Sequence, residues 1–180
     1  MERRTLVVGA AAGAVASVAM GMYAMVAAAT YQHTGFFTPL YHIASPLIGT
    51  DTLMRSMGST YLSAGPALLG LATHMMVGAA WGIVFAVLAR ALRLSGAAAV
   101  GVGVVYGLAV MLAMAFVGLP VTAALLRGGD VVRDMPTLVG WGTFATEHAI
   151  YGMVLGLGYA IGTRSVVAER PRGTARVAAA

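Results

Sequence analysis

Residues 67–89 read ALLGLATHMMVGAAWGIVFAVLA and contain no charged side chain. At about 1.5 Å per residue, a helix of this length crosses the ~30 Å hydrocarbon core of a bilayer. The stretch does not alternate between polar and apolar residues, so a membrane strand is not indicated. Because lipid offers the backbone no hydrogen-bond partner, we expect a transmembrane helix here.

Three more segments have the same character, and they cover residues 5–30, 97–120 and 138–161. The whole chain is 59% hydrophobic and only 9% charged, whereas soluble domains are about 25% charged. The sequence therefore predicts an all-α membrane protein with four transmembrane helices in one domain, residues 1–163. Its solvent is the lipid bilayer, and its expected location is the cell membrane.

The arginines predict the orientation of this bundle. All 11 basic residues are arginine, and the two sides of the predicted bundle share them unequally: Arg3, Arg4, Arg90, Arg93, Arg164, Arg170, Arg172 and Arg176 against Arg55, Arg127 and Arg133. The arginine-rich side is expected to face the cytoplasm. Both termini then lie inside, residues 31–66 form an outer loop, and residues 164–180 form an Arg-rich cytoplasmic tail.

The first apolar segment also has features of a secretory signal peptide. Glu2-Arg3-Arg4 precedes it, and Ala27-Ala28-Ala29 would suit a cleavage site. Since the apolar core of a signal peptide is usually about 7–15 residues and this segment is longer, we predict a retained helix, with cleavage as the alternative.

Two polar connections lie on the predicted outer side. Within the first, residues 36–43 are locally apolar and are expected to form a short interfacial helix or a re-entrant piece. The second, residues 121–137, is expected to be a loop with a turn at Gly128-Gly129-Asp130.

A short pattern occurs twice. The spacing His-x3-Gly-x3-Gly-x3-Ala begins at His74 and again at His148. Small residues four positions apart lie on one face of a helix and let two backbones approach closely. The pattern predicts two repeated helical hairpins with GxxxG packing at Gly78, Gly82, Gly152 and Gly156; a ligand groove at these glycines is the alternative.

These two His-x3-Gly-x3-Gly helices, together with Glu147, Tyr151 and the small-residue first helix, resemble a family of uncharacterised bacterial four-helix integral membrane proteins. The resemblance covers most of the chain between Leu6 and Ile161. It implies the same bundle and no established activity.

The histidines form the candidate site. On the predicted spans, His74 lies about 10 Å and His148 about 15 Å from the outer ends of their helices, at 1.5 Å per residue. Glu147 is the only carboxylate in a predicted span, and a charge at that depth costs roughly 2.5–3.5 kcal/mol on insertion scales. His33 and His42 follow the first helix on the same outer side.

Three interpretations of this site stay open. His74 and His148 are inter-helical hydrogen-bond donors, or they hold a b-type haem or a transition metal, or they belong to a proton or solute pathway. For a metal, the candidate ligands are His74, His148, Glu147, His33 and His42. The many methionines of the spans make copper(I) one option.

The chain contains no cysteine, which excludes disulfides and thiolate metal sites. It also lacks the usual hydrolase, metalloprotease, phosphate-loop and nucleic-acid motifs. We therefore expect a non-enzymatic membrane protein that works as an accessory or assembly component or as a small homo-oligomer. A haem- or metal-binding membrane protein and a small transporter or proton pathway are the alternatives.

Overall fold

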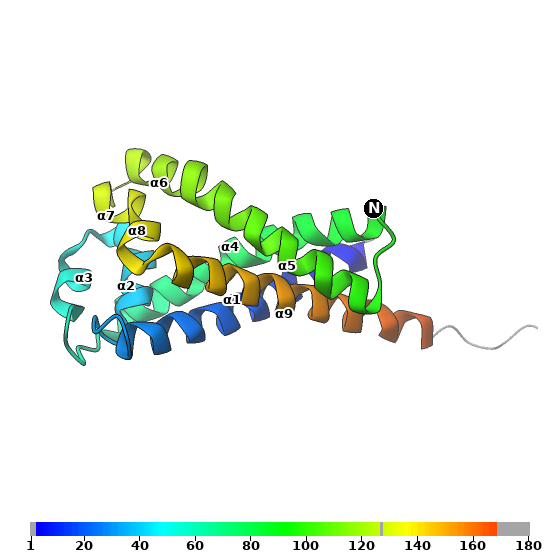
Figure 1. The fold of residues 1–180 in the computed structure, drawn as a ribbon, viewed down its shortest axis with the longest axis horizontal. Helices are drawn as coiled ribbons and strands as arrows, with labels where there is room; N and C mark the ends of the chain where they lie inside the picture. Colours follow the sequence, from blue (N-terminus) through cyan, green and yellow to red (C-terminus); the bar gives the residue numbers. More distant parts are fainter. Residues whose placement is uncertain (1–2, 127, 169–180) are drawn as a thin grey trace, which may run out of the picture.

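The computed structural model describes residues 3–126 and 128–168, with side chains as far as residue 163, and in this part of the chain all regular structure is helical. Long helices run side by side along the molecule (Figure 1). They are α1 (Arg3–Ala29), α4 (Ala64–Ala91), α5 (Gly96–Ala113) and α9 (Trp141–Ala168). The all-helical fold class is confirmed for these residues.

Helix α5 does not stop where the sequence suggested. It continues through a π-helical turn, η1 (Met114–Gly118), into α6 (Leu119–Leu125). In this turn the Leu119 N–H donates to the Met114 carbonyl, five residues back. Pro120 has no N–H to donate, and a local π turn lets a helix pass such a residue. The expected helix end at Pro120 is therefore wrong.

Short helices occupy both outer connections. The first contains α2 (Thr38–Ile48) and α3 (Asp51–Ser56), so the apolar stretch 36–43 does enter a short helix. The second contains α7 (Gly129–Arg133) and α8 (Met135–Val139), so describing residues 121–137 as a loop was wrong. Gly129 has a φ of 53°, in the left-handed region that glycine tolerates, at the point where the chain turns into α7.

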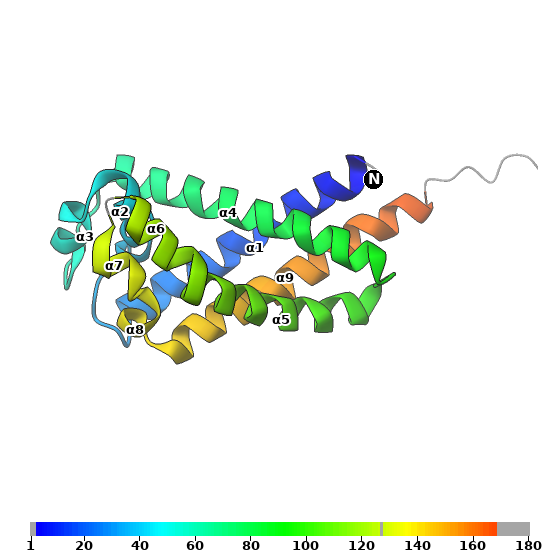
Figure 2. The ribbon, with the colours of Figure 1, turned by 90° about the horizontal axis from the view of Figure 1, so that it is seen from above.

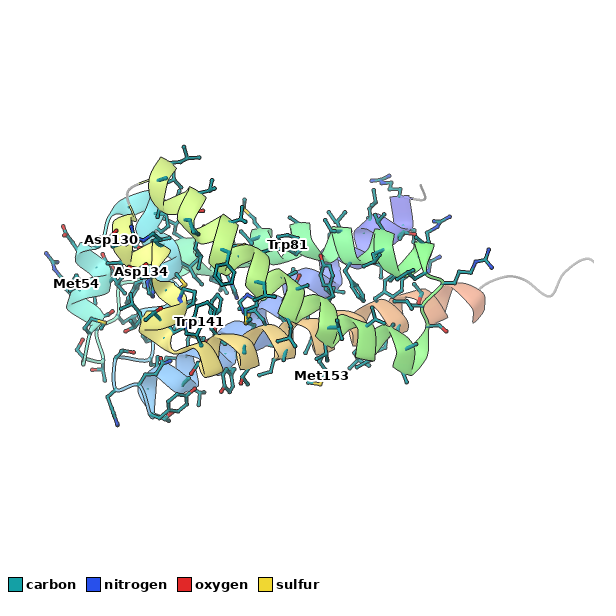
Figure 3. All side chains as sticks on the ribbon, turned by 45° about the horizontal axis from the view of Figure 1, so that its top comes forward. Met54, Trp81, Asp130, Asp134, Trp141 and Met153 are labelled. Carbon is teal, nitrogen blue, oxygen red and sulfur yellow. The ribbon has the colours of Figure 1, made fainter. Side chains whose placement is uncertain are left out.

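The two ends of the bundle differ. The start of α1, the turn between α4 and α5, and the end of α9 lie together at one end, and all four short helices lie at the other (Figures 1 and 2). Arg90 and Arg93 belong to the first end, whereas Asp130 and Asp134 lie among the short helices (Figure 3).

Small residues bring the long helices together in two pairs. Helix α1 packs on α4, and α5 packs on α9. A Cβ added at Gly82 would come within 2.8 Å of the Gly13 Cα, and one added at Gly156 within 2.8 Å of the Val100 Cα. Gly78 likewise lies against α1 and Gly152 against α5. The two pairs meet through α1 and α9, while α4 and α5 touch only sparsely.

The distribution of large apolar side chains is that of a protein in lipid. The interior is built largely from alanine and glycine, whereas Val15, Met76 and Val105 are 62%, 72% and 67% exposed on the outside of the long helices. Three helical segments are long and apolar enough to cross a membrane: Arg3–Ala29, Ala64–Ala91 and Gly96–Leu125. Over its described residues α9, which carries Glu147 and His148, is not among them.

The ends of the expected segments shift by a few residues. Helix α9 reaches Ala168, beyond the expected end at residue 161, and so takes up the first residues of the expected tail. Residues 169–180 of that tail lie outside the described residues, as do Glu2 and Arg127.

Candidate functional site

A cavity of about 310 Å³ lies between the two helix pairs, on the side where the short helices are. This is near the lower end of the roughly 300–1,000 Å³ range of small-molecule sites. Its walls come from α1, α2, α4, α9 and the interrupted helix α5–η1–α6, with single contributions from α7 and α8. Three of the four histidines line it: His42, His74 and His148.

His148 has a fixed ring orientation. Its Nδ1–H donates to the carbonyl oxygen of Phe144, one turn earlier on α9, at 2.8 Å. A carbonyl can only accept, so in the neutral ring Nε2 carries the unshared electron pair. The ring lies against Phe144, with ring centroids 4.4 Å apart. The sequence-based expectation of a bond to a neighbouring helix was wrong for this nitrogen, because the partner is on the same helix.

His74 lies on α4 and contacts the main chain of Ser17 on α1. Its Nε2 is buried and finds no hydrogen-bond partner among the described residues. Gly21 lies beside this nitrogen, and a Cβ added there would be in ordinary contact with it, at 3.8 Å. An unsatisfied polar atom in an apolar interior calls for an explanation.

His42 enters the site from the short helix α2, outside the long helices. Its Nε2–H donates to the Val131 carbonyl at 2.8 Å, and this hydrogen bond joins the two connections that contain the short helices. Burial lowers the pKa of His42, and the bond to Val131 opposes this effect. The neutral ring therefore presents Nδ1 as its acceptor.

Glu147 lies beside a second, smaller cavity of about 50 Å³, which His42 and His74 also line. The carboxylate-bearing side chain is only 7% exposed. Nearby, the Tyr31 hydroxyl lies 3.0 Å from the Thr143 hydroxyl and 3.3 Å from that of Tyr23. Glu147 thus belongs to the polar outer margin of the site, next to the main cavity.

His33 does not join this group. It follows α1 with a φ of 54° and lines neither of the two cavities described above. Within residues 3–126 and 128–168, no three histidine or acidic side chains lie close enough together to hold a metal ion. Of the five ligands suggested by the sequence, the structure brings His42, His74 and His148 to one cavity and Glu147 to its neighbour.

An aromatic cluster closes the cavity toward the arginine-bearing end. The Tyr106 hydroxyl donates to the Trp81 carbonyl at 2.7 Å and links α5 to α4, and the Tyr106 and Phe85 ring centroids are 5.1 Å apart. The Tyr151 hydroxyl donates to the Gly78 carbonyl at 2.7 Å and links α9 to α4. Trp81 lies about midway along the bundle in Figure 3. Sequence reasoning did not single out Tyr106 or Trp81, since single aromatic residues in apolar helices give no distinct signal.

The mouth of the cavity is apolar. Of the residues that line it, Leu47, Val77 and Leu126 are exposed, at 47%, 40% and 46%. Leu47 lies on α2 and Val77 on α4, and Leu126 directly follows α6, so the opening lies where α4 and the interrupted helix separate. Aliphatic side chains around an opening favour entry from lipid over entry from water.

No protein-family model matches the chain, and searches of the curated proteins and of the solved structures found no match either. The resemblance to the bacterial four-helix membrane family therefore stays a prediction.

Proposed function

We propose that this chain is a non-enzymatic protein of the cell membrane that crosses the bilayer four times, with both termini in the cytoplasm. The apolar exterior and the three helical segments suited to spanning support this topology. Helix α9 serves as the fourth span, because it lies among the other three and its Glu147 and His148 are turned inward, at 7% and 5% exposure. The two glycine-packed pairs, α1–α4 and α5–α9, correspond to the proposed repeat.

Within this bundle, the proposed function is to hold a small apolar molecule in the histidine-lined cavity. The observation that carries the proposal is one cavity of about 310 Å³ that contains three histidines and opens at three aliphatic residues. A packed interior has few voids larger than a water molecule, and a cavity of about 150 Å³ already binds benzene. A void of this size among glycine-packed helices is more space than packing alone requires.

A cavity-filling substitution tests this function. Val110 is 5% exposed and lines the cavity from α5, whereas Val105, on the same helix, is 67% exposed and does not. We expect the protein in lipid nanodiscs to bind 4-butylphenol or 4-butylanisole saturably in equilibrium dialysis, with empty nanodiscs as the blank. Val110→Phe should weaken binding more than tenfold, or about 1.4 kcal/mol, and Val105→Phe should not change it. Absence of saturable, Val110-dependent binding of both probes would refute the function.

A second candidate is haem or metal binding by His74 and His148. The Nδ1–H bond of His148 favours it, because this kind of bond orients Nε2 as a ligand. A Soret band or a stoichiometric metal that is lost in His74→Ala and in His148→Ala would support this candidate. A colourless sample free of transition metals would remove it.

The protein is also proposed to work with other membrane proteins, as an accessory or assembly component or as a small homo-oligomer. The support is the absence of catalytic motifs in the given sequence. Purification in mild detergent followed by mass measurement tests this part, since a lone monomer without a stoichiometric partner would contradict it. A transporter or proton pathway is less well supported, because among residues 3–126 and 128–168 only one long helix is interrupted.

A further inference from the structure

The walls of the cavity restrict the chemistry of what it holds. The residues at its opening are aliphatic, and Trp81, Phe144 and Tyr151 add aromatic surface deeper inside. Rings prefer such surroundings, because offset and edge-to-face contacts add to the burial of apolar area. The polar side chains that line the cavity are the three histidines, Tyr151 and the hydroxyl-bearing Ser17, Thr73 and Thr122.

Two of the histidine rings that line the cavity offer acceptor nitrogens to a ligand. His148 uses Nδ1 as donor to Phe144 and His42 uses Nε2 as donor to Val131, so each neutral ring retains one acceptor nitrogen. The Tyr151 hydroxyl has already given its hydrogen to Gly78. The hydroxyls of Thr73 and Thr122 also line the cavity and can donate or accept, but the histidine rings offer acceptor nitrogens, which a ligand with a donor can use.

We propose that the ligand is a lipid-soluble phenol that enters from the bilayer between α4 and α6 and donates its hydroxyl hydrogen to Nε2 of His148. This inference rests on the proposed function of the cavity. His74 is the second partner: its unpaired Nε2 belongs to a ring that lines the same cavity. Because the hydroxyl hydrogen goes to His148, the phenol oxygen satisfies the Nε2 of His74 by accepting from it, which requires the tautomer of His74 with a hydrogen on Nε2.

Two matched probes separate this inference from the function itself. 4-Butylphenol and 4-butylanisole share ring and chain, but the methyl ether has no hydrogen to donate. After subtraction of empty nanodiscs, we expect the phenol to bind about tenfold more tightly, as one good hydrogen bond allows. His148→Phe should remove this preference. His33→Asn should keep it, because His33 does not line the described cavity.

A spectroscopic experiment on the unaltered protein tests the same inference if His148→Phe does not fold. The chain has only four histidines, so 15N-histidine labelling of the unaltered protein gives a spectrum of four rings. 4-Butylphenol should shift the 15N resonance of the unprotonated Nε2 in one ring whose Nδ1 carries the hydrogen. 4-Butylanisole should leave this resonance unchanged. Equal binding of the two probes, or a phenol preference without any histidine shift, would overturn the inference and leave the function standing. If neither probe binds, the function fails as well.

Discussion

Replacement of Gly82 by alanine tests how α1 and α4 are held together within their pair. The new Cβ would lie 2.8 Å from the Gly13 Cα, whereas ordinary contact begins at 3.4–4 Å. Helices α1 and α4 must therefore separate by at least about 0.6–1.2 Å at this point, because the Gly9 carbonyl oxygen lies closer still to the new Cβ. A gap of 0.5–1 Å already forfeits about a quarter to a half of a contact's dispersion energy. Overpacking of this kind typically costs about 1–3 kcal/mol, and we expect Gly82→Ala to fall in this range.

The matched control is Gly101→Ala on α5, where a Cβ would meet nothing within 4 Å in the described structure. Alanine has the higher helix propensity by about 1 kcal/mol, so this variant should be neutral or slightly more stable. The assay is reversible unfolding of the purified protein in mixed micelles as the denaturing detergent is increased. If Gly82→Ala is as stable as the unaltered protein, or if both variants lose stability equally, the close approach of α1 and α4 does not hold the fold together.

Two other substitutions have defined outcomes. Tyr106→Phe removes the hydrogen bond to the Trp81 carbonyl. It should lower the free energy of unfolding by about 0.6 kcal/mol, the average for such bonds in membrane proteins. The unfolding of this variant is compared with that of Tyr61→Phe, and equal stabilities would count against the bridge between α4 and α5. For His42, burial lowers the pKa of the folded protein's ring, so the unfolded chain binds a proton more readily. Its contribution to stability is therefore complete above the ordinary histidine pKa of about 6.5 and declines as the pH falls from there toward the lowered value, by at most about 1.4 kcal/mol per pH unit. Unfolding at pH 7.5 and 5.5 should show a smaller decline for His42→Gln than for the unaltered protein, and equal declines would contradict the role of this ring.

The long helices could be predicted from the sequence because membrane spans are defined by length and apolarity alone. In the pattern around His74, Gly78 and Gly82 are four residues apart, and both lie against α1. What failed was the region after Pro120. A proline normally ends a helix, and the π turn at Met114–Gly118 that carries the helix past it leaves no recognisable sequence pattern.

The site could be predicted only in part. Depth counted from the predicted helix ends placed His74 and His148 in the outer half, and both do line one cavity. His42 was assigned to a loop, and its position beside them depends on α2 folding back onto the bundle. The cavity itself could not be predicted, because it arises where α4 and the interrupted helix diverge. That divergence is a property of packing between segments distant in the sequence.

Single-cysteine labelling tests the membrane topology most directly, because the chain contains no cysteine of its own. Ser59 lies among the short helices of the proposed outer side, and Ser95 lies in the turn between α4 and α5. A membrane-impermeant maleimide applied to intact cells should label Ser59→Cys at once and Ser95→Cys only after lysis. Labelling of both positions in intact cells, or of Ser95→Cys alone, would contradict the proposed topology and with it the proposed outward-facing histidine site.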